Sequence, residues 1–292
     1  MTSDARAVLR RTGLAPKKSF GQNFLVSSHT VDAIAAACIP DSEVGRARVL
    51  ELGAGTGALT RALAMRARSV VAVERDRDLV PVLNEELADL PEGRVRILEG
   101  DAQTVDPREL LGAPDPDSPR VLCGNLPYQI TGRLLERAVV HADDVERVVF
   151  MVQLEVADRL AAEPGSKTYG ALTVFVRAAF KSAKLFAVGP GSFHPPPDVT
   201  SAVIRLEPER PRRAQETDMF RALVKGAFGT RRKTLRNAWR GVAALDVIAK
   251  AAAEAGISLD ARGETLSVDQ FAAMAHAMGD EGAPTEPRRK DS

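Results

Sequence analysis

Residues 48–57 read RVLELGAGTG, a short apolar run joined to a loop with glycine at every second position. The apolar run, residues 48–52, predicts a buried strand, and a helix is expected from Ala58 onward. Because glycine has no side chain, it lets the backbone turn sharply and approach a bound molecule closely. The stretch therefore predicts a strand, a ligand-binding loop and a helix, which form the opening unit of a doubly wound α/β sheet.

Two further predicted strands, at residues 69–73 and 95–99, end next to carboxylates. Glu74 lies about 20 residues beyond the glycines, where such sheets place a carboxylate that accepts hydrogen bonds from ribose hydroxyls. Asp101 follows the next strand and can accept from an adenine amine. The Gly-x-Gly-x-Gly spacing, with Glu51 just before it, favours a cationic nucleoside over a pyrophosphate. A strand-end carboxylate often only caps a helix. The interpretation therefore depends on Glu51, Glu74 and Asp101 occurring together beside the loop.

A fourth predicted strand, at residues 120–124, delivers NLPY to its carboxyl end, where open α/β sheets bind ligands. The Asn125 side-chain oxygen and the Leu126 carbonyl can both accept hydrogen bonds from one exocyclic amine. Pro127 restricts the turn, and Tyr128 offers a flat face on which a base can stack. Two acceptors favour a pyramidal nitrogen whose lone pair can attack a methyl group. A simple proline turn with a surface tyrosine explains this motif alone equally well.

The rest of the chain alternates helices with strands up to residue 206 and is helical beyond it. Further strands are expected at residues 145–153 and 200–206, and another is expected to end at residue 188. Further helices are expected at residues 28–39, 131–141, 171–180, 219–228, 233–240, 244–255 and 268–278, and another is expected to end at residue 160. This order predicts an α/β fold, a doubly wound, mostly parallel, seven-stranded Rossmann-like sheet with an antiparallel hairpin at one edge.

Three regions follow from this pattern. Residues 1–206 are predicted to form the sheet domain, preceded by a basic N-terminal arm that is either a short helix or disordered. Residues 207–278 are predicted to form a small basic helical domain. The tail, residues 279–292, contains two prolines and many charges and is expected to be disordered.

Positive charge is concentrated in two segments, although the formal net charge is only +1. Residues 205–240 contain eleven basic and four acidic residues, and residues 1–20 contain five basic residues and one acidic residue. Within the first segment, Arg232 and Arg236 are four positions apart on a predicted helix and would share one stripe. The two segments can form a phosphate-binding face. Charge runs are also common on solvated helices, so the charge alone leaves this open.

The composition of the 292-residue chain, 45% hydrophobic and 27% charged, is typical of a soluble globular protein. No uncharged apolar run approaches the roughly 18 residues that a membrane-spanning helix needs, and the N-terminus does not resemble a secretory signal. We therefore expect a cytoplasmic protein with no membrane partner. Cys38, Cys123 and the four histidines have no metal-binding spacing, so no metal is expected.

Two segments with aromatic residues lie outside the predicted strands. Residues 17–25, KKSFGQNFL, combine cations, aromatic rings and amides. We interpret them as a segment that folds over a bound ligand, with Gln22 and Asn23 as polar contacts; a helix entrance with two buried phenylalanines is the alternative. Residues 193–197, FHPPP, predict a stiff loop that presents the ring of Phe193, because consecutive prolines restrict the backbone.

Five motifs together resemble those of the ribosomal RNA adenine N6,N6-dimethyltransferases. They are FGQNFL at residues 20–25, ELGAGTG at 51–57, NLPYQI at 125–130, FHPPP at 193–197 and RRKTLRN at 231–237. The resemblance extends from about residue 10 to residue 278, and within the family it points to the bacterial small-subunit branch, which is associated with kasugamycin sensitivity. It implies S-adenosylmethionine as the methyl donor. The implied acceptors are two adjacent adenosines in the 3′-terminal hairpin loop of small-subunit rRNA.

The resemblance also implies roles for individual residues. The implied cofactor contacts are Asn23, Leu25, Gly53, Glu74, Asp101 and Asn125. Asn125 and the Leu126 carbonyl would hold the target amine, with Tyr128 and Phe193 stacking on either side of an extruded adenine. Leu154 and Asp198 replace lysines that are usual in the family, which affects RNA docking more than methyl transfer. The small ribosomal subunit is the expected partner, and the protein is expected to be a monomer.

Three other functions explain parts of the sequence. An NAD-dependent dehydrogenase would use the glycine loop, but it explains neither NLPY nor the basic helical segment. A large-subunit rRNA methyltransferase of the macrolide-resistance type tends to have isoleucine in place of Leu126, and the motif at residues 231–237 argues against it. A non-catalytic RNA binder of ribosome assembly would retain the fold, but the intact cofactor positions favour catalysis.

Overall fold

The computed structural model describes residues 4–230 and 232–279. The chain divides into two compact units, and the first contains the residues up to Ala157 together with Ser182–Pro208. The second contains Asp158–Lys181 and the residues from Glu209 onward. Residues 158–181, which the sequence placed in the sheet domain, thus belong to the helical unit, because α8 (Ala171–Ala179) buries its apolar side in the core of that unit. The predicted disordered tail lies, from residue 280 onward, outside the described residues.

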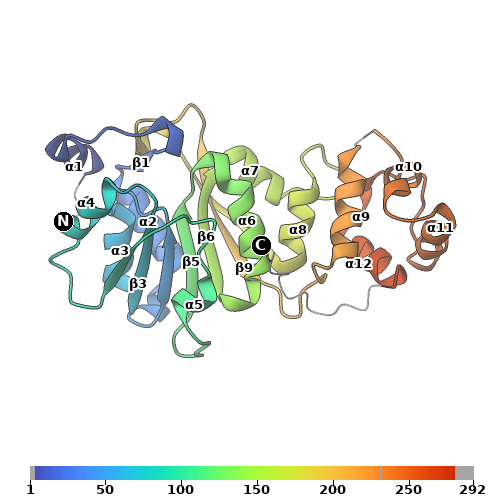
Figure 1. The fold of residues 1–292 in the computed structure, drawn as a ribbon, viewed down its shortest axis with the longest axis horizontal. Coiled ribbons are helices and arrows are strands. Elements are labelled where there is room, and N and C mark those ends of the chain that lie inside the picture. Colours follow the sequence, from blue (N-terminus) through green and yellow to red (C-terminus); the bar gives the residue numbers. More distant parts are fainter. Residues whose placement is uncertain (1–3, 231, 280–292) are drawn as a thin grey trace, which may run out of the picture. The chain divides into compact units, whose positions relative to one another are not determined.

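The first unit is built on a seven-stranded sheet with the order β4-β3-β2-β5-β6-β9-β7 (Figure 1). The strands are β2 (Arg48–Leu52), β3 (Ser69–Glu74), β4 (Val95–Glu99), β5 (Arg120–Asn125), β6 (Arg147–Gln153), β7 (Phe180–Val188) and β9 (Ser201–Pro208). Neighbouring strands from β4 to β6 are parallel, whereas β9 is antiparallel to β6. The predicted fold class, a mostly parallel Rossmann-like sheet, is confirmed.

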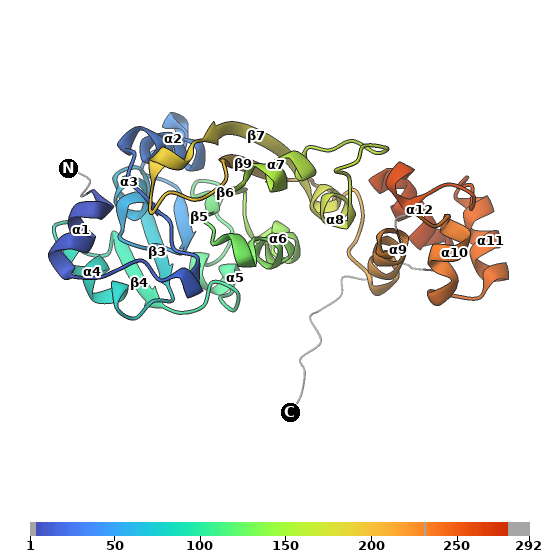
Figure 2. The same cartoon turned by 90° about the horizontal axis from the view of Figure 1, so that it is seen from above.

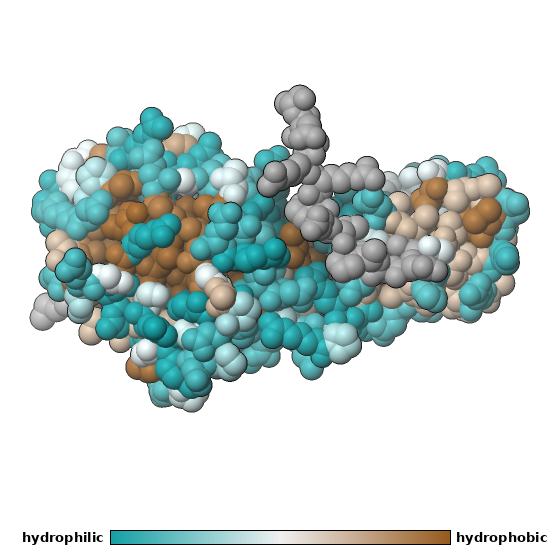
Figure 3. Space-filling model, turned by 60° about the horizontal axis from the view of Figure 1, so that its bottom comes forward, coloured by the Kyte–Doolittle hydropathy of each residue, from teal (hydrophilic) through white to brown (hydrophobic). Residues whose placement is uncertain are grey.

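Helices cover both faces of this sheet (Figure 2). The helices that begin in this unit are α1 (Ala5–Thr12), α2 (Ser28–Cys38), α3 (Ala58–Arg66), α4 (Leu79–Glu86), α5 (Pro107–Leu111), α6 (Thr131–Val140) and α7 (Leu154–Leu160). Helices α2, α3 and α4 pack on the face formed by residues such as Val49, Val70 and Ala72. Helices α5 and α6 lie on the other face, next to Leu52 and Leu122. On the side shown in Figure 3, apolar side chains reach the surface of this unit within a hydrophilic border.

A second, two-stranded sheet was not predicted. It pairs β1 (Phe24–Leu25) with β8 (Phe193–His194) in antiparallel register, with Phe24 opposite His194 and Leu25 opposite Phe193. Strands of two residues are too short to show an alternating pattern, and these two are far apart in sequence. This sheet connects the N-terminal segment to the loop that follows β7.

The second unit is helical. It contains α8, α9 (Asp218–Gly229), α10 (Leu235–Ala238), α11 (Leu245–Glu254) and α12 (Val268–Ala277). Trp239 is completely buried at its centre, where the indole N–H donates a 2.8 Å hydrogen bond to the Leu223 carbonyl. The helix predicted at residues 233–240 begins only at Leu235, because the preceding residue, Thr234, is extended. Arg232 and Arg236 therefore do not share a helical stripe, and that prediction was wrong.

Across residues 4–230 and 232–279, no helix combines the length and the apolar character needed to cross a membrane.

Candidate active site

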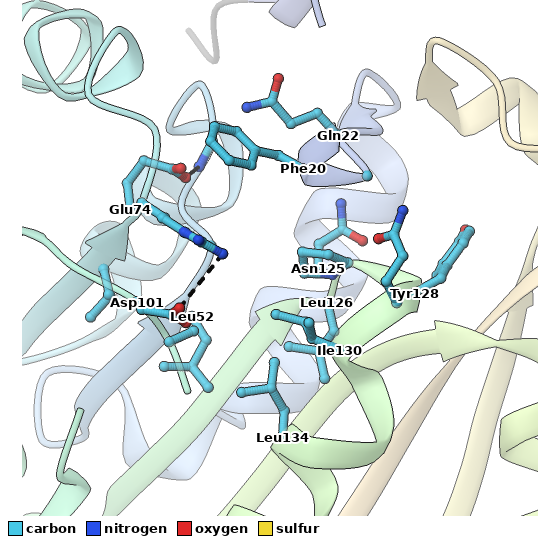
Figure 4. Close-up of a pocket in the computed structure, with 18 of the residues that line it drawn as sticks. Phe20, Gln22, Leu52, Glu74, Asp101, Asn125, Leu126, Tyr128, Ile130 and Leu134 are labelled. Atoms are coloured by element: carbon cyan, nitrogen blue, oxygen red, sulfur yellow. Dashed lines mark hydrogen bonds and ion pairs between the residues drawn. The ribbon is translucent and has the colours of Figure 1, made fainter. Parts of the chain in front are cut away.

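The predicted ligand-binding residues come together at the carboxyl ends of four adjacent strands. Because β4, β3, β2 and β5 are parallel neighbours, their carboxyl ends share one edge of the sheet. Gly53 follows β2, Glu74 ends β3, Asp101 lies just beyond β4 and Asn125 ends β5. All four line one cavity, with Glu74 and Asp101 on one side of it and Asn125 on the other (Figure 4).

The glycine loop is fastened to β3 by Glu74. The Gly55 N–H donates to Glu74 Oε2 and the Asp76 N–H donates to Glu74 Oε1, both at 2.8 Å. Gly53 and Gly55 have φ angles of +79° and +59°, which non-glycine residues rarely adopt. Burial raises the pKa of Glu74 above its ordinary value, and the backbone hydrogen bonds offset this only in part. The carboxylate thus shapes the loop and also faces the cavity.

The N-terminal segment lines the cavity and is fastened to the turn that follows β3. Lys17 Nζ lies 2.5 Å from Asp76 Oδ1 and 2.6 Å from Asp78 Oδ2, and Gln22 Nε2 donates to Asp76 Oδ2 at 2.7 Å. Burial alone would raise the pKa of Asp76, but the hydrogen bonds from Lys17 and Gln22 lower it. Residues from Ser19 to Phe24 line the cavity, and α2 begins only at Ser28. The segment is therefore part of the cavity wall and not the entrance of a helix.

The side chain of Asn125 is oriented by a backbone group. Its Nδ2 donates a 2.8 Å hydrogen bond to the Asn23 carbonyl, which leaves Oδ1 as the acceptor that the side chain offers to the cavity. The next residue, Leu126, is held by its N–H, which donates to the Met151 carbonyl at 3.2 Å. Asn125, Leu126, Pro127 and Tyr128 all line the cavity, so the motif provides a polar acceptor beside an aromatic ring.

The ring of Tyr128 is held in place by its hydroxyl group. Tyr128 Oη lies 2.7 Å from Ser201 Oγ, a hydrogen bond that joins the motif to the first residue of β9. Burial raises the pKa of this hydroxyl group above its ordinary value. The tyrosine is therefore neutral at physiological pH and presents a fixed aromatic face to the cavity.

Two of the predicted site residues do not line the cavity. Leu25 is 5% exposed and Phe193 is 1% exposed, and both pack in the hydrophobic cluster that includes α2. They lie opposite each other in the β1–β8 pair. The expectation that residues 193–197 present an exposed ring was wrong, because this pairing turns Phe193 into the core. The remaining predicted residues, Asn23, Gly53, Glu74, Asp101, Asn125, Leu126, Pro127 and Tyr128, all line the cavity.

Sequence reasoning missed two features of the cavity wall. Asp76 is 3% exposed and anchors the N-terminal segment, and the only signal was the charged run ERDRD at residues 74–78, directly at a strand end. Gln129 packs against Gly21, where a Cβ atom would lie 2.1 Å from Gln129 Oε1. Gly21 therefore has to remain a glycine for Gln129 to keep this position in the wall.

The chemistry of the cavity fits a nucleoside that carries positive charge. Glu74 and Asp101 supply two carboxylates, and the glycine loop leaves its backbone open to a ligand. Arg75 Nη1 lies 3.6 Å from Asp101 Oδ2 and is the one cationic side chain among the lining residues. Among the described residues, no group of three or more His, Cys, Asp or Glu is placed to hold a metal ion.

A pH-dependent stability is expected from Glu51, which lies directly behind the glycine loop. It is 1% exposed, its Oε2 has no hydrogen-bond partner in the described structure, and burial together with the charge of Glu74 raises its pKa from 4.5 to about 8. The folded chain therefore retains a proton that the unfolded chain releases, so stability falls as pH rises from 4.5 to about 8. Between pH 4.5 and 7, the wild type should lose roughly 3 kcal/mol more than Glu51→Gln. Urea unfolding at both pH values measures this difference, and identical pH profiles would contradict it.

Known proteins resemble this chain over most of its length. The family described as Ribosomal RNA adenine dimethylase matches residues 13–280. The Ribosomal RNA small subunit methyltransferase A of Geobacter metallireducens is 45% identical over 278 residues, which cover 92% of this chain and 98% of that protein. The protein of the same name from Myxococcus xanthus is 41% identical over 279 residues, which cover 94% of this chain and 95% of that protein.

Solved structures share the fold. A dimethyladenosine transferase from Plasmodium falciparum has a TM-score of 0.70 at 24% identity and covers 86% of this chain and 95% of its own. The 23S rRNA methyltransferase ErmE has a TM-score of 0.63 at 25% identity and covers 88% of this chain and 100% of its own. With one family matching nearly the whole length of the chain, and relatives above 40% identity, this protein belongs to the ribosomal RNA adenine dimethylase family.

Proposed function

We propose that this protein transfers methyl groups from S-adenosylmethionine to N6 of two adjacent adenosines in the 3′-terminal hairpin loop of small-subunit (16S) rRNA. The products would be N6,N6-dimethyladenosines, formed during small-subunit biogenesis. Family membership supports the reaction, and the names of the relatives support the small subunit as the substrate. The observation that carries the proposal is Asn125, whose amide is fixed by Asn23 so that its oxygen is free for an amine.

In this proposal the two sides of the cavity have separate roles. Glu74 and Asp101 accept hydrogen bonds from the ribose hydroxyls and the adenine amine of S-adenosylmethionine, and this is supported by their position in the cavity wall with Gly53 and Gly55. When bound, this cofactor supplies an electrophilic methyl group. On the other side, Asn125 Oδ1 and the Leu126 carbonyl accept hydrogen bonds from the two N–H groups of the target amine and so direct its lone pair toward the methyl group. Tyr128 stacks on the adenine, which has to leave its own stack to reach the cavity.

The helical unit is proposed to dock on rRNA. Arg232, Lys233 and Arg240 are exposed there, although Arg236 lies 3.7 Å from Asp260 and is partly neutralised. Leu154 and Asp198, in place of the usual lysines, remove positive charge from the first unit. The helical unit therefore carries a larger share of the phosphate contacts in this proposal. We also propose that the protein acts as a monomer in the cytoplasm.

Methyl transfer to isolated ribosomal subunits tests this function. Small and large subunits that lack the modification are incubated with S-adenosylmethionine carrying a labelled methyl group, and the label in each rRNA is measured. Label is expected in the small subunit, on two neighbouring adenosines. Label in the large subunit would indicate the macrolide-resistance reaction instead. Binding of small subunits without transfer, by a protein that binds S-adenosylmethionine, would indicate a non-catalytic assembly factor.

A further inference from the structure

An open hollow beside α1 combines a basic rim with an apolar floor. The lining residues that matter here are Arg6, Arg10 and His194 on the rim and Leu9, Leu14 and Pro16 on the floor. Among the described residues that line this hollow, none is acidic. It is separate from the cavity described above, with which it shares no lining residue. Its basic and apolar lining residues fit an anion attached to an apolar group.

The two arginines of the rim have no internal electrostatic partner. Arg6 and Arg10 are four residues apart, so they lie on the same side of α1 and their charges repel each other. Both are exposed, and within residues 4–230 and 232–279 neither guanidinium group has a carboxylate within 4.0 Å, although the Arg6 backbone N–H donates to Asp4 Oδ1. Arg11 of the same helix is different, because it lies 3.4 Å from Glu85 and 2.5 Å from Glu86. An external anion between Arg6 and Arg10 would offset their repulsion.

A short chain of contacts connects this hollow to the acceptor amide. His194 lies opposite Phe24 in the β1–β8 pair. Phe24 directly follows Asn23, whose carbonyl accepts the hydrogen bond from Asn125 Nδ2. The β1–β8 pair thus joins one wall of the hollow to the residue that orients Asn125. When one nucleotide of an RNA strand lies at Asn125, the neighbouring phosphodiester groups of that strand are only one nucleotide away from it along the chain.

We propose that this hollow binds a phosphodiester group of the RNA strand next to the target adenosine. Arg6 and Arg10 donate hydrogen bonds to its oxygens, for which the guanidinium fork is well suited, and His194 adds a further polar ring. The apolar floor receives the sugar or base attached to that phosphate. The inference rests on the proposed function, because it requires an RNA substrate at Asn125. It adds a binding site on the sheet-bearing unit, independent of the helical unit.

Salt-dependent binding of a short single-stranded oligoribonucleotide with two adjacent adenosines tests the site. The full-length protein carrying Arg6→Ala and Arg10→Ala is compared with the wild type over a range of salt concentrations. Each phosphate contact on a single strand contributes about 0.7 to the slope of log affinity against log salt, so loss of this one contact should flatten the slope by about 0.7. The paired lysine variant, Arg6→Lys with Arg10→Lys, retains both charges and should keep most of the slope. His194→Ala should weaken binding to a smaller extent.

The matched control is Arg46→Ala with Arg68→Ala. Both arginines are exposed and precede β2 and β3, at the opposite end of the strands from the cavity. This variant loses the same net charge and should bind as the wild type does. An unchanged slope in the Arg6 and Arg10 variant, or an equal change in the control, would overturn the proposed site. Methyl transfer to small subunits is measured in parallel, and its absence in the wild type would overturn the proposed function and not the RNA-binding result.

Discussion

Asn125→Ala is expected to lower the rate of methyl transfer by about 10²–10³-fold, the loss seen when one fixed polar partner of a transition state is removed. The affinity for S-adenosylmethionine should change little, because the glycine loop, Glu74 and Asp101 remain in place. The physical reason is that the target amine donates its strongest hydrogen bond to Asn125 Oδ1 when the amine nitrogen becomes pyramidal. Single-turnover transfer with saturating small subunits measures the rate, and calorimetric titration measures cofactor affinity.

Asn125→Asp tests whether an acceptor oxygen is sufficient without the hydrogen bond that orients it. Aspartate retains an oxygen for the amine but has no Nδ2 to donate to the Asn23 carbonyl, and its charge repels that carbonyl. We therefore expect no rescue of activity. Wild-type rates in the Asp variant would show that the contact with Asn23 does not orient the site. Rates near wild type in the Ala variant would remove Asn125 from the mechanism altogether.

Glu74→Gln is expected to weaken S-adenosylmethionine binding by about 10- to 100-fold, since a hydrogen bond to a charged group contributes roughly 1.5–3 kcal/mol. Both carboxylate oxygens accept backbone hydrogen bonds, from Gly55 and from Asp76. An amide can accept at only one of these positions, so one buried N–H loses its partner and the glycine loop is released. The rate at saturating cofactor should fall less than the affinity, because Asn125 is not altered.

Glu99→Gln is the matched control for this change. Glu99 lies opposite Glu74 in the register of β3 and β4 and ends its own strand, but it is exposed and pairs with Arg77 at the surface. Surface ion pairs contribute little to stability, so this variant should bind the cofactor normally. An unchanged dissociation constant in Glu74→Gln would show that the carboxylate has no part in cofactor binding. Equal losses in both variants would point to a general effect of charge.

The sheet and most of the cavity could be predicted from the sequence because their signals are local. The run at residues 48–52 has valine or leucine on both sides of the strand, and β2 occupies these same residues. The glycines that follow it adopt positive φ angles, which is the property that their spacing indicated. Parallel strands then bring their carboxyl ends to one edge, so Glu74, Asp101 and Asn125 meet without any further information.

The contacts that finish the site were decided only by the tertiary structure. The pairing of β1 with β8, which buries Phe193, joins segments too short to show a periodic pattern. The ion pairs of Lys17 with Asp76 and Asp78 join residues far apart in sequence, and many other carboxylates could have served as partners. Local sequence limits backbone conformation and burial, whereas the choice of a distant partner depends on how the whole chain packs. For this protein, the sequence determined the sheet edge and the residues that meet there, and packing decided which side chains line the cavity and which are buried.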